Sequence, residues 1–312
     1  MQYQTDISAG IKLKASELGF LECAILPSTF LEEEKSRYEK WLKAGMHGEM
    51  GYMERNIDKR LDPGLLFEGA KSLVIVLQNY YPAQQQQDEQ APILSKYAYG
   101  NDYHYVIREK LRKLLEYIQE VNGPCNARPF TDSAPVLERA WARRAGMGWI
   151  GKNSNLISTL HGSFFFIGEL IIDVELPYDQ PRLVSDHCGT CTRCIDACPT
   201  GAIVSNRSID ARKCISYQTI ELKGPLDDEL EGKFKNRVFG CDICQDVCPW
   251  NLKSEPHEEP DLAPGIDLLQ LTKDDWYKID KPKFNKLFKN SAVKRTGFSG
   301  LKRNLNFIQD SQ

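Results

Sequence analysis

Residues 188–199 read CGTCTRCIDACP, in which four cysteines follow the spacing C-x2-C-x2-C-x3-C-P. This spacing is typical of bacterial ferredoxins, whose thiolates bind iron–sulfur clusters. A second run, CDICQDVCP at 241–249, adds three cysteines, and Cys214 stands between the two runs. Because eight thiolates are the number that two [4Fe–4S] clusters require, the spacing predicts a ferredoxin-like two-cluster module.

The ferredoxin pattern also predicts which cysteines share a cluster, because the fourth cysteine of each run binds the other cluster. The expected ligands of cluster 1 are Cys188, Cys191, Cys194 and Cys248, and those of cluster 2 are Cys198, Cys214, Cys241 and Cys244. Structural zinc sites use two C-x2-C pairs, which this pattern does not resemble. Cys23 and Cys125 lie outside it and are interpreted as buried small hydrophobic residues.

Composition and length are ordinary for a globular protein, at 312 residues, 41% hydrophobic and 27% charged. No apolar run reaches the length of a membrane span, and no signal peptide is visible at the N-terminus. Reduced thiolates together with these features favour a cytoplasmic location. We therefore expect a cytoplasmic monomer with no membrane partner.

Apolar periodicity predicts an α+β fold. Helical spacing is found at 5–18, 103–121 and 135–145, and strand-like runs are found at 71–81, 156–158 and 164–176. The final residues suit two or three short helices. We expect a sheet-and-helix catalytic domain at 1–180, the two-cluster module at 181–255 and a short basic helical segment at 256–312.

Generic cofactor motifs do not identify the acceptor of the electrons. The glycines of GMGWIG, at 146–151, lack the G-x-G-x-x-G arrangement, and no G-x4-G-K-[ST] motif occurs. The D-x-H-x-x-G motif, which supplies a histidine to cobalt in many cobalamin enzymes, is also absent. Neither a nicotinamide cofactor nor a nucleotide triphosphate is expected.

Three further strings precede the cysteines: KYAYGNDYH at 96–104, TDSAPVLERAWARRAGMGWIGKN at 131–153 and FFFIGEL at 164–170. In this order, followed by the ferredoxin run, they resemble the epoxyqueuosine reductases, a family related to corrinoid-dependent reductive dehalogenases. The resemblance extends from about Arg55 to Trp250 and continues weakly beyond. Many members carry a longer C-terminal helical repeat, so a shortened, HEAT-like segment is expected here.

The resemblance implies reduction of the epoxide of epoxyqueuosine, at the wobble position of certain transfer RNAs, to queuosine. It implies a nitroreductase-like domain that holds cobalamin base-off, without a protein histidine on cobalt, and an external low-potential electron donor. Asp132 matches the proton donor proposed for the family. A carboxylic acid serves that role only where its surroundings keep it protonated. The alternative interpretation of Asp132 is a helix cap.

The resemblance also implies the remaining site residues. Expected cobalamin contacts are Arg55, Arg60, Tyr97, Asp132, Lys152, Asn153, Ser154, Leu156 and Ile157. For the arginines a solvated surface position is the alternative, and for the tyrosine it is a place in the core. Residues 281–312 carry eight basic residues and one aspartate. Expected RNA phosphate contacts in this tail are Lys294, Arg295, Lys302 and Arg303, although a solvated helix face gives the same pattern.

Two other functions remain open. One is a corrinoid-dependent reductase of small molecules, similar to a dehalogenase, and the other is a ferredoxin-type electron carrier with an added domain. Cobalamin binding separates the carrier from the two reductases. Dependence on transfer RNA separates the two reductases from each other.

Overall fold

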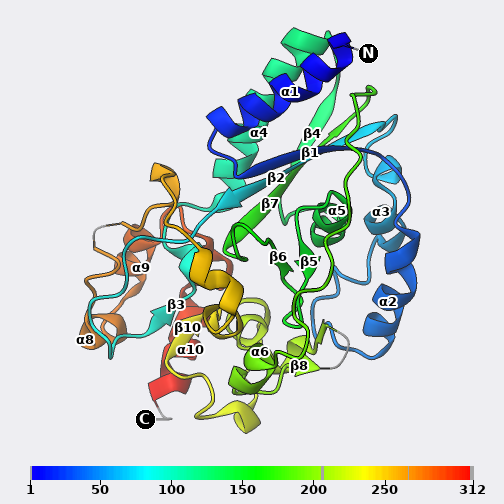
Figure 1. Ribbon diagram of the computed structural model, residues 1–312. Coiled ribbons are helices and arrows are strands. Elements are labelled where there is room, and N and C mark those ends of the chain that lie inside the picture. Colours follow the sequence, from blue (N-terminus) through cyan, green and yellow to red (C-terminus); the bar gives the residue numbers. More distant parts are fainter. Residues whose placement is uncertain (1, 205–206, 266, 310–312) are drawn as a thin grey trace.

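A four-stranded antiparallel sheet is the frame of the N-terminal half (Figure 1). The computed structural model describes residues 2–204, 207–265 and 267–309. The strands are ordered β1 (Glu22–Pro27), β2 (Ser72–Asn79), β7 (Phe165–Ile172) and β4 (Ala127–Phe130). The central strands β2 and β7 confirm the two strands expected from the longest apolar runs. Their continuous apolar character suits strands that are covered on both faces.

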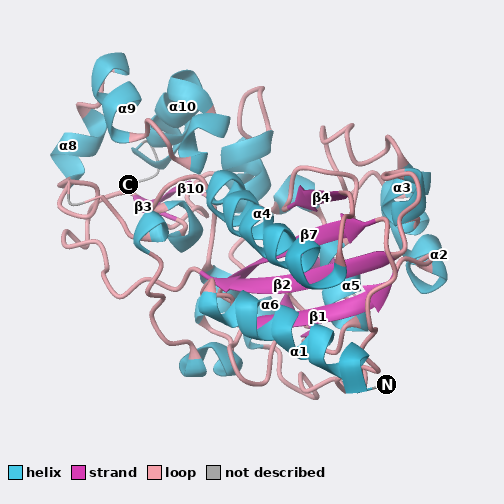
Figure 2. Cartoon of the chain, turned by 90° about the horizontal axis from the view of Figure 1, so that it is seen from above, coloured by secondary structure: helices cyan, strands magenta, loops and turns pink. Residues whose placement is uncertain are grey.

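Helices cover both faces of this sheet. On one face lie α1 (Gln2–Glu17) and α4 (Tyr103–Asn122), as Figure 2 shows. Toward the other face lie α2 (Glu32–Lys43), α3 (Ile57–Leu61) and α5 (Glu138–Arg144). Side chains alternate along β2, so that Val74 and Val76 pack with α4, whereas Ile75 packs with Trp141 of α5. The three helices expected in this half are confirmed, with α5 beginning three residues later than predicted.

Three two-stranded sheets supplement the main one. They pair β5 (Trp149–Ile150) with β6 (Leu156–Ile157), β3 (Ile93–Leu94) with β10 (Arg237–Phe239), and β8 (Ile203–Val204) with β9 (Ser208–Ile209). The strand predicted at 156–158 is therefore present as β6, but it belongs to a small hairpin and does not extend the main sheet. That hairpin encloses the turn formed by residues 151–155.

Short helices are spread through the C-terminal part of the chain. They are α6 (Arg193–Ala197), α7 (Ile243–Asp246), α8 (Lys273–Tyr277), α9 (Lys281–Leu287) and α10 (Gly297–Gln309). Of these, α8, α9 and α10 lie at the lower left of Figure 1. One core joins them to the cysteine segment, because Trp276 and Leu301 belong to the same buried cluster as Phe239. This packing runs across the boundary predicted at 256. The nitroreductase-like and HEAT-like descriptions stay predictions.

No helix within the described ranges has both the length and the apolar character that crossing a bilayer requires.

Gly168 allows α4 to approach β7 closely. A Cβ atom at this position would lie 2.8 Å from Ile107 Cγ2 and 3.3 Å from Leu111 Cδ1, both on α4. The first distance is shorter than packed carbon atoms tolerate, so a side chain here would push the helix away from the sheet.

We expect Gly168→Val to lower the free energy of unfolding by about 1–3 kcal/mol, because the added methyl groups overpack this contact. Urea unfolding of matched preparations, followed by circular dichroism, measures the change. Gly224→Val is the control, since a Cβ at Gly224 meets nothing within 4 Å. An equal loss in both variants would show that valine itself, and not the contact with α4, is responsible.

Candidate active site

The eight cysteines of the ferredoxin pattern lie in two groups. Cys188, Cys191, Cys194 and Cys248 line one cavity, together with Ile157 and Trp250. In the other group the Cys244 thiol interacts electrostatically with those of Cys214 and Cys241, and Cys214 interacts with Cys198. The structure therefore groups the thiols as the ferredoxin rule does, and the assignment of ligands to clusters stays a prediction.

Burial raises the pKa of the Cys244 thiol well above its ordinary value, and the neighbouring thiols raise it further. The same two causes raise the pKa of Cys194. Crowded, desolvated thiolates repel one another unless cations lie between them. This donor set fits two [4Fe–4S] clusters, whose iron ions supply that charge.

The turn between β5 and β6 holds both cysteine loops. Lys152 Nζ donates to the backbone oxygens of Gly189 and Cys191 at 2.8 and 2.9 Å. Asn153 Nδ2 donates to the backbone oxygen of Cys244 at 3.3 Å. Just before the turn, the Trp149 indole N–H donates to Cys188 Sγ at 3.4 Å. Lys152 and Asn153, expected to contact cobalamin, are thus attached to the cluster segments.

Other residues expected at the cofactor site occupy varied positions. Leu156 and Ile157 are buried, and Ser154 has the left-handed φ of 61° and donates to a backbone oxygen. Arg60 is 7% exposed and donates to the Tyr52 backbone oxygen at 2.9 Å, and its Nε lacks a partner among the described residues. Arg55 is exposed in the turn before α3. The structure does not bring all of the expected contacts into one cluster.

Asp132 lies in the loop between β4 and α5, with a left-handed φ of 51°. Its Oδ2 accepts a hydrogen bond of 2.5 Å from the Tyr103 hydroxyl, and its backbone N–H donates to Glu138 Oε1. Helix α5 begins at Glu138, and the residue before it makes no side-chain cap. The helix-cap interpretation of Asp132 is therefore wrong. The carboxyl is exposed and is oriented by a tyrosine instead.

Aromatic rings connect Asp132 to the cysteines. Tyr103 stacks on Phe166 with ring centroids 4.1 Å apart and an interplanar angle of 8°. Tyr97 lies edge-on to Tyr103, with centroids 5.9 Å apart. Burial raises the pKa of the Tyr103 phenol well above its usual value, and the Asp132 charge adds to this effect. The phenol therefore keeps its proton and remains a donor to Asp132.

The Cys241–Cys244 run lies beside Tyr97. A Cβ atom built on Gly240, directly before this run, would lie 3.5 Å from Tyr97 Cε1. Within the run, Asp242 accepts hydrogen bonds from the Ser95 hydroxyl and from the backbone N–H of Lys96 at 2.8 Å. The segment around Tyr97 is thus fixed against the second cysteine group.

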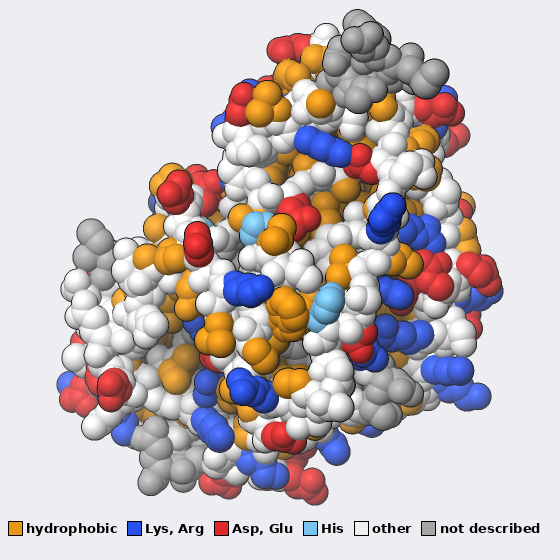
Figure 3. Space-filling model, viewed as in Figure 1, with side chains coloured by type: hydrophobic (Ala, Val, Ile, Leu, Met, Phe, Trp, Pro, Cys, Tyr) orange, Lys and Arg blue, Asp and Glu red, His pale blue; other side chains and the backbone are white. Residues whose placement is uncertain are grey.

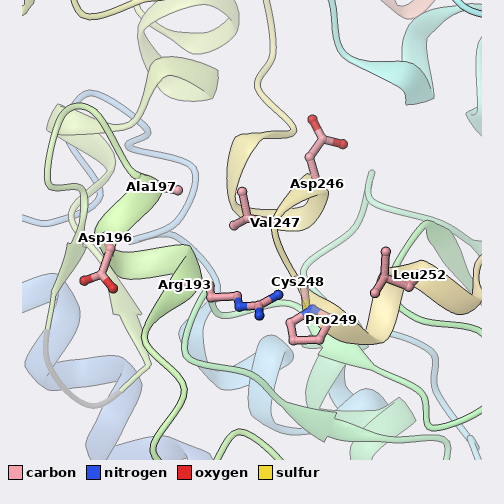
Figure 4. A pocket seen from close by; sticks show the side chains of 8 residues that line it. All are labelled: Arg193, Asp196, Ala197, Asp246, Val247, Cys248, Pro249 and Leu252. Atoms are coloured by element: carbon pink, nitrogen blue, oxygen red, sulfur yellow. The ribbon is translucent and has the colours of Figure 1, made fainter.

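The first cysteine group borders an open pocket of about 580 Å³. Figure 4 shows Arg193, at the start of α6, directed across this pocket toward Cys248 and Pro249. Leu252, in the short 3-10 helix Pro249–Lys253, is 84% exposed and lines the same pocket. Cys248 is thus the one thiol of the first group among the residues that line this pocket, and it is itself 9% exposed.

The basic residues of the tail differ in their surroundings. Arg303 donates to the backbone oxygens of Leu222, Gly224 and Gln218, all within 3.0 Å, and so braces the C-terminal core. Lys302 donates to a backbone oxygen at 2.7 Å.

Arg295 forms a bidentate pair with Glu221, at 2.5 and 2.8 Å, and Lys294 is exposed. Basic and acidic side chains of the described residues are interspersed over the face shown in Figure 3. Lys294 and Arg295 are the better placed of the four residues expected to contact RNA.

The motifs in the sequence did not identify two candidate functional residues, Glu138 and Glu169. Glu138 holds the Asp132 backbone, and Glu169 on β7 is 0% exposed within the sheet. The signal for Glu169 was visible, because it is the one acidic residue in the apolar run FFFIGELII at 164–172. Nothing in the local sequence indicates that Glu138 turns back toward Asp132.

The chain is similar to known proteins in sequence. Residues 187–251 match a 4Fe-4S double cluster binding domain, and residues 60–133 match the family described as Epoxyqueuosine reductase QueG, DUF1730. An epoxyqueuosine reductase of Cellulophaga algicola is 58% identical over 299 residues, covering 96% of this chain and 97% of that protein. The Escherichia coli enzyme is 42% identical over 300 residues, covering 95% of this chain and 78% of that protein.

Solved structures are also similar. A crystal structure of epoxyqueuosine reductase with an epoxyqueuosine-modified tRNA-Tyr stem loop has a TM-score of 0.89 at 29% identity, covering 98% of this chain and 81% of that chain. The Bacillus subtilis epoxyqueuosine reductase, with its aspartate catalytic loop swung out of the active site, has a TM-score of 0.86 at the same identity and coverage. With 58% identity to a named relative over nearly its whole length, the chain belongs to the epoxyqueuosine reductase family.

Proposed function

We propose that this chain reduces the epoxide of epoxyqueuosine in transfer RNA to queuosine, using two [4Fe–4S] clusters and cobalamin. The observation that carries the proposal is the placement of Asp132, which is oriented by Tyr103 and connected through Tyr97 to the Cys241–Cys244 run. Family membership supports it, as does the related enzyme solved with an epoxyqueuosine-modified stem loop. A transfer RNA substrate would place the enzyme in the cytoplasm.

Cobalamin, when bound, would supply a cobalt centre that accepts electrons singly and reduces the carbon–oxygen bond. The residues that fit it best are Tyr97, beside the second cysteine group, and Arg60, whose buried Nε has no partner in the described ranges. A corrin offers many amide oxygens to such a donor. The base-off form is a proposal that rests on the absence of the D-x-H-x-x-G motif from the sequence.

We infer a direction for the electrons. Cluster 1, bound by Cys188, Cys191, Cys194 and Cys248, would receive them from an external low-potential donor, because Cys248 borders the open pocket. Cluster 2, bound by Cys198, Cys214, Cys241 and Cys244, would pass them to the cofactor beside Tyr97. Cys194 and Cys244 interact electrostatically, so the two groups are neighbours.

Asp132 would give its proton to the epoxide oxygen as the carbon–oxygen bond opens. Tyr103 holds the carboxyl in place through the 2.5 Å hydrogen bond. A related enzyme has an aspartate on a catalytic loop that can leave the active site, which supports a loop-borne acid in this family.

Replacing the acid tests this role. In Asp132→Asn we expect both clusters and cobalamin to remain, while turnover falls by about 100-fold or more, because the amide has no proton to give. Anaerobic assays with epoxyqueuosine-containing transfer RNA, a strong reductant and added cobalamin, read by mass spectrometry of nucleosides, measure it. Asp228→Asn, at an exposed position, is the matched control. Near-normal turnover in Asp132→Asn would remove the residue from the mechanism.

Removing one cysteine tests the cluster assignment. Cys248→Ser should lower the iron content by roughly half and abolish turnover, because cluster 1 loses a ligand and cluster 2 keeps all four. Cys125→Ser should change neither, since Cys125 is a buried thiol outside the pattern. Iron analysis measures the iron content of each variant, and electron paramagnetic resonance identifies the clusters that remain. Loss of both clusters in Cys248→Ser with an otherwise folded chain would contradict independent ligand sets.

The salt dependence of RNA binding tests whether the tail contacts RNA phosphates. We expect Lys294→Ala to weaken binding of the modified stem loop severalfold and to lower the slope of log affinity against log salt by about 1. Lys40→Ala, at an exposed position on α2, is the control. An unchanged slope in Lys294→Ala would place the phosphates elsewhere.

A further inference from the structure

Two carboxyls lie behind Asp132, and the mechanism above uses neither. Glu169 is 0% exposed in β7, and within the described ranges neither of its carboxyl oxygens has a hydrogen-bond partner. In the sheet it is aligned with Ile75 on one side and Phe130 on the other. Since Phe130 precedes Asp132 by two residues, Glu169 lies directly under the loop that bears the acid.

Glu138 occupies the other side of this loop. Its Oε1 accepts the backbone N–H of Asp132, and its position as the first residue of α5 places it over the same face of the sheet. Ile75 and Phe130, the neighbours of Glu169, belong to the core that packs against α5. The three carboxyls thus form one group, which we call the carboxyl triad: Asp132, Glu138 and Glu169.

Three basic residues interact electrostatically with the triad: Arg60 and Arg139 with Glu138, and Arg139 and Arg295 with Asp132. Arg37 and Glu34 interact with Arg139 in turn. Burial raises the pKa of Glu169 well above its usual value, and the charges of Glu138 and Asp132 raise it further. Burial and the Asp132 charge also raise the pKa of Glu138, whereas Arg139 and Arg60 lower it. On the opposite side of Asp132 lies the neutral phenol of Tyr103. In this environment Glu169 is an acid that keeps its proton above the ordinary range of a glutamate.

The reaction requires more protons than Asp132 carries. Conversion of an epoxide to an alkene and water consumes two electrons and two protons. The first proton goes to the oxygen when one carbon–oxygen bond opens, giving a hydroxyl group. The second goes to that hydroxyl when the other carbon–oxygen bond breaks, so that it leaves as water. Asp132 supplies one proton and is then a carboxylate.

We propose that Glu138 and Glu169 are a proton reserve that recharges Asp132 within each turnover. A proton passes from Glu138 to the Asp132 carboxylate, and Glu169 then returns a proton to Glu138, so each transfer joins one carboxylic acid and one carboxylate. After the product leaves, two solvent protons enter at the exposed Asp132 and restore Asp132 and, through Glu138, Glu169. Both consumed protons end in the released water, and the electrons come from the external donor through the clusters. The inference rests on the proposed function, and both glutamates act through Asp132, so neither is itself a catalytic residue.

Glutamine variants separate proton supply from positioning. The amide oxygen of Glu138→Gln still accepts the Asp132 N–H, so a purely positional role would be preserved, whereas the transferable proton is lost. Glu169→Gln likewise keeps shape and removes the proton. Glu175→Gln, at an exposed position three residues beyond β7, is the matched control.

The first measurement is turnover of the cluster-loaded enzyme with cobalamin and the epoxyqueuosine-modified stem loop. We expect kcat to fall at least about tenfold in Glu169→Gln and Glu138→Gln, with KM unchanged and with an altered alkaline limb of the pH profile. Glu175→Gln should match the wild type. A kcat in Glu169→Gln within about twofold of wild type would overturn the proposal. Wild-type protein that makes no queuosine would overturn the proposed function as well.

The second measurement needs no turnover. An acid whose folded pKa exceeds its unfolded pKa binds more protons when folded, so its contribution to stability is lost as pH rises above the unfolded value. The urea midpoint of the cluster-loaded wild type should therefore fall more between about pH 5 and about pH 8 than that of Glu169→Gln. If the urea midpoints of the wild type and of Glu169→Gln fall equally, Glu169 holds no proton in the folded chain and the proton reserve does not exist.

Discussion

The hydrogen bonds from Lys152 to the first cysteine loop are the contacts on which the position of the thiols depends. The Lys152 ammonium donates to two backbone oxygens of that loop, at 2.8 and 2.9 Å, and charge-assisted bonds of this kind are strong. Asn153, the next residue, holds the second cysteine run through the Cys244 carbonyl. One turn of the N-terminal domain therefore positions both groups of thiols relative to Asp132. Electron transfer weakens steeply with distance, so this spacing must be rigid.

The two groups of thiols held by this turn differ in their surroundings. Cys248 borders an open pocket with the exposed Leu252, whereas the Cys241–Cys244 run lies beside Tyr97 and is held by the bonds of Asp242 to Ser95 and Lys96. Burial and hydrogen bonds to sulfur are what tune the potentials of such clusters. The Trp149 N–H on Cys188 Sγ and the neighbouring charges at Cys244 give the two groups of thiols different environments.

Local sequence was enough for much of this architecture. Helix α4 and strands β2 and β7 follow from periodicity, because that signal is carried by neighbouring residues. The grouping of the thiols was expected from the ferredoxin rule, which relates residues of two separate runs. Asp132 was identified through resemblance, and its surroundings were not predictable. The bond from Tyr103 to Asp132 joins residues 29 positions apart. Arg303 was expected to contact RNA because it is basic, yet its three carbonyl partners lie about eighty positions earlier in the chain.

Glu169 shows most clearly how function departs from local rules. An ionisable side chain at the centre of an apolar strand, 0% exposed and without a protein partner in the described ranges, destabilises the fold. Valine or isoleucine would suit the strand and the core around Trp141 better. Sequences tend to break local rules at functional sites and to compensate elsewhere. Here the sheet is continuous and apolar on both sides of Glu169, and its stability offsets the cost of the buried carboxyl. In our proposal, this carboxyl is kept because it retains a proton beneath Asp132.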